Sequence, residues 1–258
     1  PDPDKAAAAI TPRTRAIALV TPNNPGGVEY PAALVQEFFD LARRHGIALI
    51  LDETYRDFHS RPGAPHALFS DPDWHDTLIH LYSFSKAYRL TGHRVGALIA
   101  SRKRLAEVEK FLDTVAICPA QIGQHGDFTI KAGSFPSVRS RAQELERHDG
   151  PWLADEREEI LARRAAIAAL MPKIDPLGWE LLGLGGYFAY LRHPFNLSSA
   201  ELAPQLVRDA GVLCLPGTMF QPEGDARGES QLRIAFANLD TAGLEVLFDR
   251  LAALPRNA

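Results

Sequence analysis

Side chains that can act as nucleophiles, acids or anion ligands stand directly after three apolar stretches of the sequence. The three groups are Asn23 and Asn24, then Asp52 and Tyr55, then Ser83, Ser85 and Lys86. A lysine that is desolvated near other cations loses its proton more easily and becomes a nucleophile toward carbonyl groups. Lys86, in S-F-S-K, is therefore the candidate centre of carbonyl chemistry, with an amide, a carboxylate, a phenol and two hydroxyls near it.

The first two groups belong to a predicted β-α-β unit. The apolar run Ala16 to Val20 is a buried strand followed by the breaker-rich T-P-N-N-P-G-G. Apolar residues at helical spacing predict a helix over Pro31 to His45, with Gly46 as its stop, and Ile47 to Asp52 is the second strand. Such crossovers join parallel strands, and ligands of open parallel sheets bind outside the carboxyl ends of the strands. The polar groups should therefore meet at one edge of the sheet.

A third strand, Thr77 to Tyr82, delivers Ser83 and Lys86 to the same edge. The next strand, Val95 to Ala100, follows too soon for a helical crossover, so we expect it to be antiparallel. The residue pattern from Arg102 onward is typical of helix, and the stretch from Gly126 to Gly150 is left unassigned.

The carboxy-terminal part is predicted to form a smaller α+β domain. Strong helix formers predict a long helix over Glu156 to Met171. Four short strands are expected at W-E-L-L, Y-F-A-Y-L, G-V-L-C-L-P and Q-L-R-I-A-F, with helices at Ser199 to Ala210 and Thr241 to Leu254. The predicted fold is α/β, a mostly parallel sheet with helices on both faces in residues 1–150, plus the small domain in residues 151–258.

Each candidate also has a plain structural interpretation. An isolated lysine is usually a solvated surface group, and an acid at a strand end often caps the following turn. Tyrosine commonly packs its ring in a core, and asparagines beside Pro25 and Gly26 are ordinary turn residues. The ordered context of the motifs favours the functional interpretation.

Composition and charge limit the class of protein. The 258 residues are 46% hydrophobic and 23% charged, which is typical of a globular chain. A formal charge of −4 gives no basic field for a phosphate backbone, so nucleic acid is not an expected partner. No apolar run approaches the roughly 20 residues of a membrane span, so no membrane partner is expected. Sparse cysteine usage, Cys118 and Cys214, suits a reducing compartment and buried thiols, so we expect a cytoplasmic protein.

Four ordered motifs resemble those of the fold-type I, class I/II aminotransferases, which use pyridoxal 5′-phosphate (PLP). The motifs are T-P-N-N-P-G-G at Thr21 to Gly27, D-E-T-Y at Asp52 to Tyr55, S-F-S-K-A-Y-R-L-T-G-H-R-V-G at Ser83 to Gly96, and Q-L-R-I-A-F at Gln231 to Phe236. A weaker fifth is G-V-L-C-L-P-G-T-M-F, Gly211 to Phe220. The resemblance spans nearly the whole chain in family order. It implies the PLP-dependent transferase fold, with residues 1–150 as part of the PLP-binding large domain.

The resemblance implies a role for each matching residue. Lys86 would form the Schiff base with the cofactor and shuttle the proton, and Asp52 would pair with the pyridine nitrogen and keep it protonated. Tyr55 and Asn24 would hydrogen-bond the phenolic oxygen of the ring, with Asn24 also near the substrate. Ser83, Ser85 and Arg94 would hold the phosphate, because a dianion needs a charged fork and neutral donors.

Arg233 would bind the α-carboxylate of the substrate. In a strand, Leu232, Ile234 and Phe236 share one face while Arg233 shares the other with small alanines, which leaves room for a carboxylate. A purely structural arginine is the alternative at this position.

The resemblance also implies the reaction and the assembly. We expect a ping-pong transfer of an amino group between an amino acid and a 2-oxo acid in a homodimer. Two alternatives remain open: other PLP chemistry on the same fold, such as β-elimination or decarboxylation, and an aminotransferase-like effector domain of a transcriptional regulator.

Some features depart from the family pattern. Gly26 replaces a usual threonine, Thr21 replaces a frequent asparagine, and Arg89 stands where a small residue is usual after the lysine. The bulky Arg89 could alter substrate choice or phosphate contacts. The chain begins with Pro1, and only about twenty residues precede T-P-N-N-P-G-G, so we expect an amino-terminally incomplete chain that lacks the family's Gly-rich phosphate loop and ring-stacking aromatic.

Three further patterns are assigned no catalytic role. G-L-G-G-Y, Gly183 to Tyr187, is expected to be a turn before a strand. The nine histidines show no metal-ligand spacing, so no metal is expected. Arg163 and Arg164 are expected on a solvated helix face of mixed charge.

Overall fold

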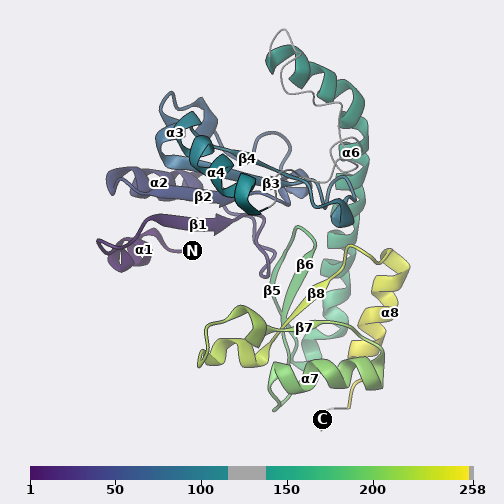
Figure 1. Cartoon of the computed structure of the whole chain (residues 1–258). Helices are drawn as coiled ribbons and strands as arrows, with labels where there is room; N and C mark the ends of the chain where they lie inside the picture. Colours follow the sequence, from purple (N-terminus) through teal and green to yellow (C-terminus); the bar gives the residue numbers. More distant parts are fainter. Residues whose placement is uncertain (116–137, 256–258) are drawn as a thin grey trace. The chain divides into compact units, whose positions relative to one another are not determined.

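The chain divides into two compact units, which are described separately. A computed structural model describes residues 1–115 and 138–255, and the side chains of 138–149 are not described (Figure 1). The first unit comprises Pro1–Thr21 and Tyr30–Asp155, and the second comprises Pro22–Glu29 and Glu156–Ala258. The short segment Pro22–Glu29, which carries the first polar motif, thus belongs with the carboxy-terminal part of the chain.

The first unit contains a four-stranded mixed sheet in the order β1-β2-β3-β4. The strands β1, β2 and β3 are parallel, and β4 is antiparallel to β3, as the short connection predicts. The elements of this unit are β1 Ala16–Val20, β2 Ala48–Asp52, β3 Leu78–Ser83, β4 Gly96–Ile99, α1 Pro3–Ala9, α2 Ala32–Arg44, α3 Trp74–Thr77, α4 Arg102–Val115, and the 3₁₀ turns η1 Arg56–Phe58, η2 Leu68–Ser70 and η3 Thr91–His93.

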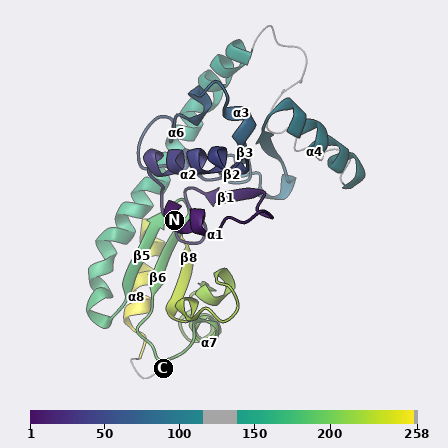
Figure 2. The same cartoon turned by 90° about the vertical axis from the view of Figure 1, so that its left-hand side faces the viewer.

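Helix α2 packs against β1 and β2 (Figure 2). It begins directly after Pro31, whose missing N–H costs nothing there, and the chain turns at Gly46 with φ +62°. The apolar face of α2 is buried, with Phe39 fully covered and Phe38 2% exposed. This packing fixes the β-α-β unit and so the positions at which β1 and β2 end.

The second unit contains an antiparallel sheet in the order β5-β6-β8-β7. Its elements are β5 Glu180–Gly185, β6 Phe188–Arg192, β7 Leu215–Pro216, β8 Gln231–Ala235, α7 Ser199–Gln205, the π-helical turn η6 Leu206–Ala210 that continues α7, α8 Thr241–Ala252, and the 3₁₀ turns η4 Met171–Lys173, η5 Asp175–Leu177, η7 Gly217–Phe220 and η8 Ala226–Ser230. Helix α7 begins with a capping box, in which Ser198 and Glu201 satisfy each other's backbone N–H groups. The buried Leu202 of α7 and the buried Leu244, Leu247 and Phe248 of α8 contribute to the core of this unit.

The long helix α6, Val138–Leu170, contributes residues to both units. It covers the helix predicted over 156–171 except for Met171, which begins a 3₁₀ turn, and it extends well upstream, through Pro151. Helix α1 was not predicted. Its N-terminus is capped by Asp2, whose side chain accepts hydrogen bonds from the N–H groups of Asp4 and Lys5.

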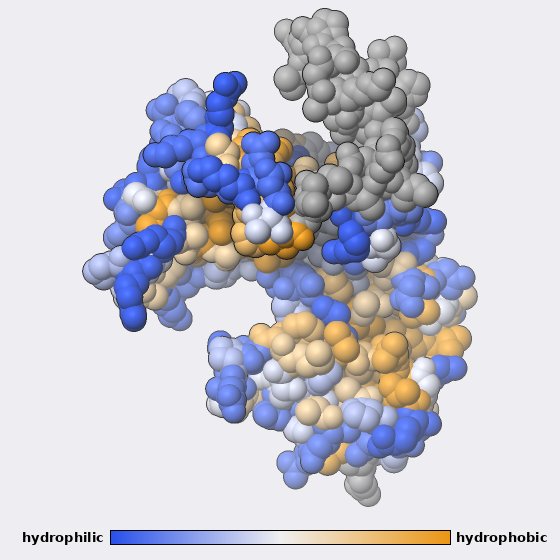
Figure 3. All heavy atoms as spheres, in the orientation of Figure 1, coloured by the Kyte–Doolittle hydropathy of each residue, from blue (hydrophilic) through white to orange (hydrophobic). Residues whose placement is uncertain are grey.

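Apolar side chains are exposed on both units (Figure 3), including Phe111 at 65% on α4 and Leu213 at 81% before β7. Within the described ranges, no helix has the length and apolar character needed to cross a membrane.

Candidate active site

The first unit gathers several of the candidate residues after the carboxyl ends of β2 and β3. Asp52, the last residue of β2, lies opposite Leu81 in the parallel register with β3. Ser83 ends β3, and Ser85 and Lys86 follow within three residues. The expected arrangement at this edge of the sheet is therefore present for Asp52, Tyr55, Ser83, Ser85 and Lys86.

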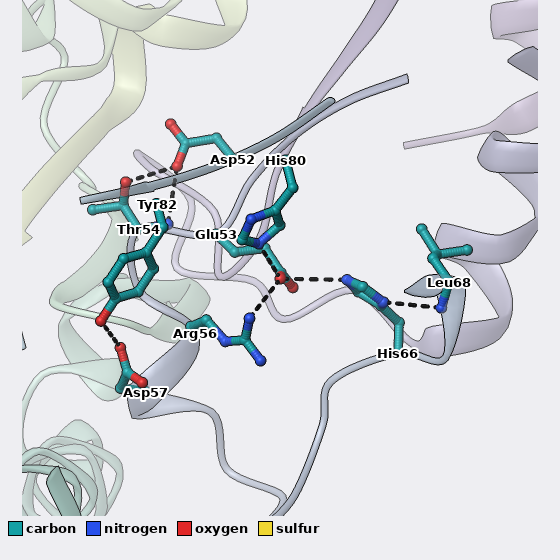
Figure 4. Close-up of polar contacts among 9 residues, drawn as sticks. All are labelled: Asp52, Glu53, Thr54, Arg56, Asp57, His66, Leu68, His80 and Tyr82. Carbon is teal, nitrogen blue, oxygen red and sulfur yellow. Dashed lines mark hydrogen bonds and ion pairs between the residues drawn. The ribbon is translucent and has the colours of Figure 1, made fainter. Parts of the chain in front are cut away.

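Thr54 orients the Asp52 carboxylate. The Thr54 backbone N–H donates to Asp52 Oδ1 over 2.9 Å, and the Thr54 hydroxyl donates to the same oxygen over 2.7 Å. Figure 4 shows the second carboxylate oxygen pointing away from Thr54. Thr54 therefore holds one Asp52 oxygen in place. The other oxygen remains available to accept a hydrogen bond from a cationic ring nitrogen.

Lys86 lies close to Tyr55. The Nζ atom of Lys86 is 5.9 Å from the centroid of the Tyr55 ring, and the tyrosine is 5% exposed. An ammonium group above an aromatic face is stabilised by the ring quadrupole. The amine and the phenol are thus neighbours within one unit.

The proposed phosphate ligands lie on the turn that follows β3. Ser83 Oγ accepts the N–H of Ser85 over 3.2 Å, and the Thr91 hydroxyl donates to the Ser85 carbonyl over 3.1 Å. Arg94 is exposed, has a left-handed backbone with φ 54°, and donates from Nη1 to the Thr91 carbonyl over 3.1 Å. The structure places these donors on one loop, and Thr91 links its two ends.

Arg89, which departs from the family pattern, also has a left-handed backbone, with φ 55°. Its guanidinium carbon lies 5.3 Å from the centroid of the Trp152 ring, and the Trp152 indole N–H donates to the Ala87 carbonyl over 3.0 Å. Trp152 therefore contacts the lysine turn at two residues, Ala87 and Arg89.

Asn24 and Arg233 both belong to the second unit and contact each other. Arg233 Nη1 donates to Asn24 Oδ1 over 2.7 Å. The Arg233 guanidinium carbon lies 4.6 Å from the Phe188 ring centroid and 4.8 Å from that of Phe220. Two aromatic faces thus hold the plane of the guanidinium, which is the geometry that bidentate binding of a carboxylate needs. The aromatic partners were not predicted, although Phe188 and Phe220 lie within segments singled out in the sequence.

The alternation predicted for β8 is confirmed. Leu232 and Ile234 are 1% and 4% exposed, Phe236 just beyond the strand is fully buried, and Ala235 is exposed.

Glycines allow the segment Pro22–Glu29 to approach the β5–β6 hairpin. A Cβ added to Gly183 would lie 2.0 Å from the Gly26 carbonyl oxygen, and one added to Gly185 would lie 2.1 Å from that of Gly27. Gly27 has φ +71°, and its added Cβ would lie 2.6 Å from the Phe188 carbonyl oxygen. The G-L-G-G-Y motif does contain the turn before β6, but its glycines also seat the loop that carries Asn24.

The expectation that Arg163 and Arg164 form a solvated face is wrong. Their side chains are only 12% and 17% exposed. Arg164 donates to Glu29 Oε1 over 2.5 Å and to the Leu184 carbonyl over 3.1 Å, and Arg163 donates to the Ala237 carbonyl. Helical periodicity shows that both arginines lie on a polar face, but the partners come from distant parts of the sequence.

A polar cluster around the buried Glu53 carboxylate, next to Asp52, was also missed. It consists of Glu53, Arg56, His66 and His80 (Figure 4). Beside it, Tyr82 donates to Asp57 Oδ2 over 2.5 Å. Burial raises the pKa of both groups, and the hydrogen bond from Tyr82 opposes this rise at Asp57. D-E-T-Y contains Glu53, but the motif drew attention only to its first and last residues.

The other expectations concern metals and thiols. Among residues 1–115 and 138–255, no group of three potential ligands is arranged to hold a metal ion. Cys214 is buried, which raises the pKa of its thiol to about 11, and Cys118 lies outside the described residues.

The donor set fits the cofactor that the resemblance implies. Within the first unit, an oriented carboxylate, a buried phenol and an amine lie after adjacent strand ends, and serine and arginine donors stand on the next loop. These are the charges and donors that a cationic ring nitrogen, a phenolic oxygen, an aldehyde and a phosphate require.

The chain belongs to the family "Aminotransferase class I and II", whose model it matches over residues 1–251. It is 25% identical to an aspartate aminotransferase of Sulfurisphaera tokodaii over 88% of this chain and 53% of that protein. It is 28% identical to aromatic-amino-acid aminotransferase 2 of Thermococcus litoralis, over 94% of this chain and 57% of that protein. The chain thus spans somewhat more than half the length of these relatives.

Solved structures confirm the fold. An aspartate aminotransferase of Thermus thermophilus superimposes with a TM-score of 0.78 and 23% identity, over 98% of this chain and 63% of that one. A methionine aminotransferase of Escherichia coli superimposes with a TM-score of 0.79 and 21% identity, over 98% of this chain and 62% of that one. The α/β fold with a second small antiparallel sheet is the fold of these enzymes.

Proposed function

We propose that this protein is a PLP-dependent aminotransferase that moves an amino group between an amino acid and a 2-oxo acid. The observation that carries the proposal is the placement of Asp52, Tyr55 and Lys86 after neighbouring parallel strands, with Lys86 Nζ 5.9 Å from the Tyr55 ring. The family match and the named activities of the relatives support the same reaction.

The residues of the first unit bind the cofactor. Lys86 forms the covalent link, Asp52 pairs with the ring nitrogen, and Tyr55 donates to the phenolic oxygen. Ser83, Ser85 and Arg94 bind the phosphate. When bound, PLP supplies an electron sink for the Cα of the substrate. Lys86 then acts as the base that moves the Cα proton.

The residues of the second unit recognise the substrate. Arg233, held between Phe188 and Phe220, binds the α-carboxylate of amino acid and oxo acid alike. Asn24, which accepts from Arg233, contacts the substrate and contributes to binding of the phenolic oxygen. In this proposal residues 1–150, apart from the segment Pro22–Glu29 that groups with the second unit, represent the PLP-binding domain, and residues 151–258 represent the small domain.

The proposal extends to assembly and location. Exposed apolar side chains on α4, among them Phe111 and Val115, favour burial against another chain, and we place the working enzyme in a cytoplasmic homodimer. Sedimentation at several concentrations measures the mass of the full-length protein.

Covalent labelling tests the central claim. PLP is added to the full-length protein, the product is reduced with borohydride, and its peptides are mapped by mass. The pyridoxyl group is expected on Lys86. Lys86→Ala should remove the label and reduce turnover by several orders of magnitude, whereas Lys110→Ala, at an exposed ion pair on α4, should change neither. Label on another lysine would refute the assignment, and a product assay with an amino acid and a 2-oxo acid distinguishes transamination from elimination.

A further inference from the structure

The Glu53 carboxylate is completely buried beside Asp52, and three side chains converge on its Oε2 atom. His80 Nε2 lies 2.8 Å from this oxygen, His66 Nε2 lies 3.3 Å away, and Arg56 Nη1 lies 3.6 Å away (Figure 4). The histidine side chains are 2% and 3% exposed. A carboxylate buried in this way requires compensation, because an unpaired buried charge strongly destabilises the folded state.

A backbone contact sets the orientation of the His66 ring. The Leu68 N–H donates to His66 Nδ1 over 3.2 Å, so this nitrogen is an acceptor and the ring carries its proton on Nε2, which faces Glu53. The alignment of that Nε2–H with the carboxylate is poor, which makes His80 the stronger hydrogen-bond donor.

Arg56 supplies the charge that balances Glu53. Burial would raise the pKa of Glu53, but the contacts with His66 and His80 and the nearby positive charge of Arg56 outweigh it and lower the pKa to about 2. The cluster is thus a carboxylate and a guanidinium with two imidazole donors. Replacing Glu53 and Arg56 with neutral residues of similar shape would remove the buried negative charge and also the positive charge that balances it.

The cluster joins the segments that carry the proposed catalytic groups. Glu53 directly follows Asp52, and the two side chains point in opposite directions (Figure 4). His80 lies on β3, which ends at Ser83, and Arg56 begins η1 directly after Tyr55. The Glu53 N–H donates to the Leu81 carbonyl, and the Arg56 N–H donates to the Glu53 carbonyl. Glu53 is therefore bonded through its main chain and its side chain to both β3 and η1.

We infer that Glu53 is a positioning residue, which through His80 and Arg56 holds Asp52 and Tyr55 in register with the Lys86 turn from the opposite face of the sheet. The inference rests on the proposed function for the roles of Asp52, Tyr55 and Lys86. Catalytic groups must be held within about 0.5 Å of their working positions, and partners of such groups commonly contribute about 10- to 100-fold.

Metal binding is a poor alternative for the same side chains. A histidine that binds a metal through Nε2 carries its proton on Nδ1, but Nδ1 of His66 faces the N–H donor of Leu68. The ring would have to turn and leave this N–H unpaired. Addition of zinc should consequently leave the melting temperature unchanged, and a rise in this temperature that is lost in Glu53→Gln would overturn the positioning role in favour of a metal site.

The main test compares Glu53→Gln with Val35→Ala in the full-length protein. Gln keeps the shape of the side chain and removes the charge, whereas Val35→Ala removes apolar volume from α2, 2% exposed, and destabilises the same unit elsewhere. Two quantities are measured. One is amide hydrogen exchange of residues 54–58 in the cofactor-free protein. The other is the dissociation constant of PLP together with the pH midpoint of its visible absorbance.

Glu53→Gln should speed exchange of the 54–58 amides by about tenfold, weaken PLP binding by about 10- to 100-fold and raise the absorbance midpoint, because Asp52 is less firmly held against the ring nitrogen. Val35→Ala should lower the melting temperature without these changes. Unchanged exchange, affinity and midpoint in Glu53→Gln would overturn the inference, even if its melting temperature fell.

A second variant covers the case in which Glu53→Gln does not fold. His80→Gln removes only the 2.8 Å bond and should shift exchange and affinity in the same direction. Wild-type values in that variant would also overturn the inference. If the unmutated protein shows no PLP label on Lys86, the proposed function fails instead, while hydrogen exchange still reports whether Glu53 holds the 54–58 turn.

Discussion

Arg233 and Asn24 are 209 positions apart in the chain, yet the arginine Nη1 donates to the asparagine Oδ1 over 2.7 Å. The contact links the residue proposed for the substrate carboxylate with a residue proposed for the cofactor oxygen. Phe188 and Phe220 fix the plane of the same guanidinium. Arg233 is thus oriented by three neighbours of its own unit.

Replacement of Arg233 by lysine should therefore damage substrate binding more than turnover. A lysine ammonium keeps the charge but lacks the planar fork and its stacking, so KM for amino acids should rise by about 10- to 100-fold with a smaller change in kcat. Steady-state kinetics with several amino acids measures the effect. Arg192→Lys is the matched control, because Arg192 on β6 forms an exposed ion pair with Glu180. Equal KM values in Arg233→Lys and the wild type would place carboxylate recognition elsewhere.

Asp52→Asn should keep the cofactor bound and slow the removal of the Cα proton. The amide no longer holds the ring nitrogen protonated, so single-turnover rates should fall by roughly 100-fold or more. Stopped-flow absorbance after mixing with an amino acid measures this rate. Asp225→Asn, at the cap of η8, should lose stability from the cap and from the ion pair with Arg227 but keep the wild-type rate. A wild-type rate in Asp52→Asn would show that the ring nitrogen needs no charged partner.

Glu53 should make the protein sensitive to acid. Its pKa falls from an ordinary 4.5 to about 2, so in this range the unfolded state binds more protons than the folded state. Stability from this group is therefore present above pH 4.5 and is lost as the pH falls toward 2, by at most about 3 kcal/mol. Urea unfolding at pH 3 and pH 6 measures it. Glu53→Gln should show a smaller difference between the two pH values, and Glu180→Gln, at an exposed pair, should behave as the wild type does.

Gly185→Ala should disturb the packing of the Pro22–Glu29 loop against the β5–β6 hairpin. The added Cβ would meet the Gly27 carbonyl at 2.1 Å, and neither backbone can move freely, so the cost should be about 1–3 kcal/mol. Thermal unfolding measures this cost, and the KM for the amino acid should rise because Asn24 shifts. Gly150→Ala is the opposite case, since Gly150 lies in α6 with open space around it and alanine favours helix. A stable Gly185→Ala variant would show that the loop does not need this approach.

Local patterns predicted most of the fold. The apolar runs located β1 and β2 to within a residue, and the short connection after Lys86 correctly indicated that β4 is antiparallel. Predicting α6 from sequence required continuation through Pro151 and Gly150, residues that normally end helices, so its upstream half was missed. Spacing located the candidates Asp52, Tyr55 and Lys86, whose separations along the chain are short.

Contacts between distant segments were beyond the reach of the sequence patterns. The aromatic partners of Arg233 and the partner of Arg164 depend on how β5, β6 and η7 pack. The motif itself did not indicate that Glu53 is buried, because an acid beside a motif is usually solvated. Only the structure places His80 2.8 Å from its carboxylate. A histidine in an otherwise apolar strand was the one available signal.

The attachment of Pro22–Glu29 to the second unit affects the order of events during synthesis. Arg164 follows its partner Glu29 by 135 residues, so at roughly 5–20 residues per second the loop leaves the ribosome about 7–27 s before the helix that holds it. Strand β1 is made before that interval, and strands β2, β3 and β4 are made during it. The asparagine loop therefore lacks its contacts with α6 and with the β5–β6 hairpin while the strands of the first sheet are made, and only the chain from Arg164 onward supplies those contacts.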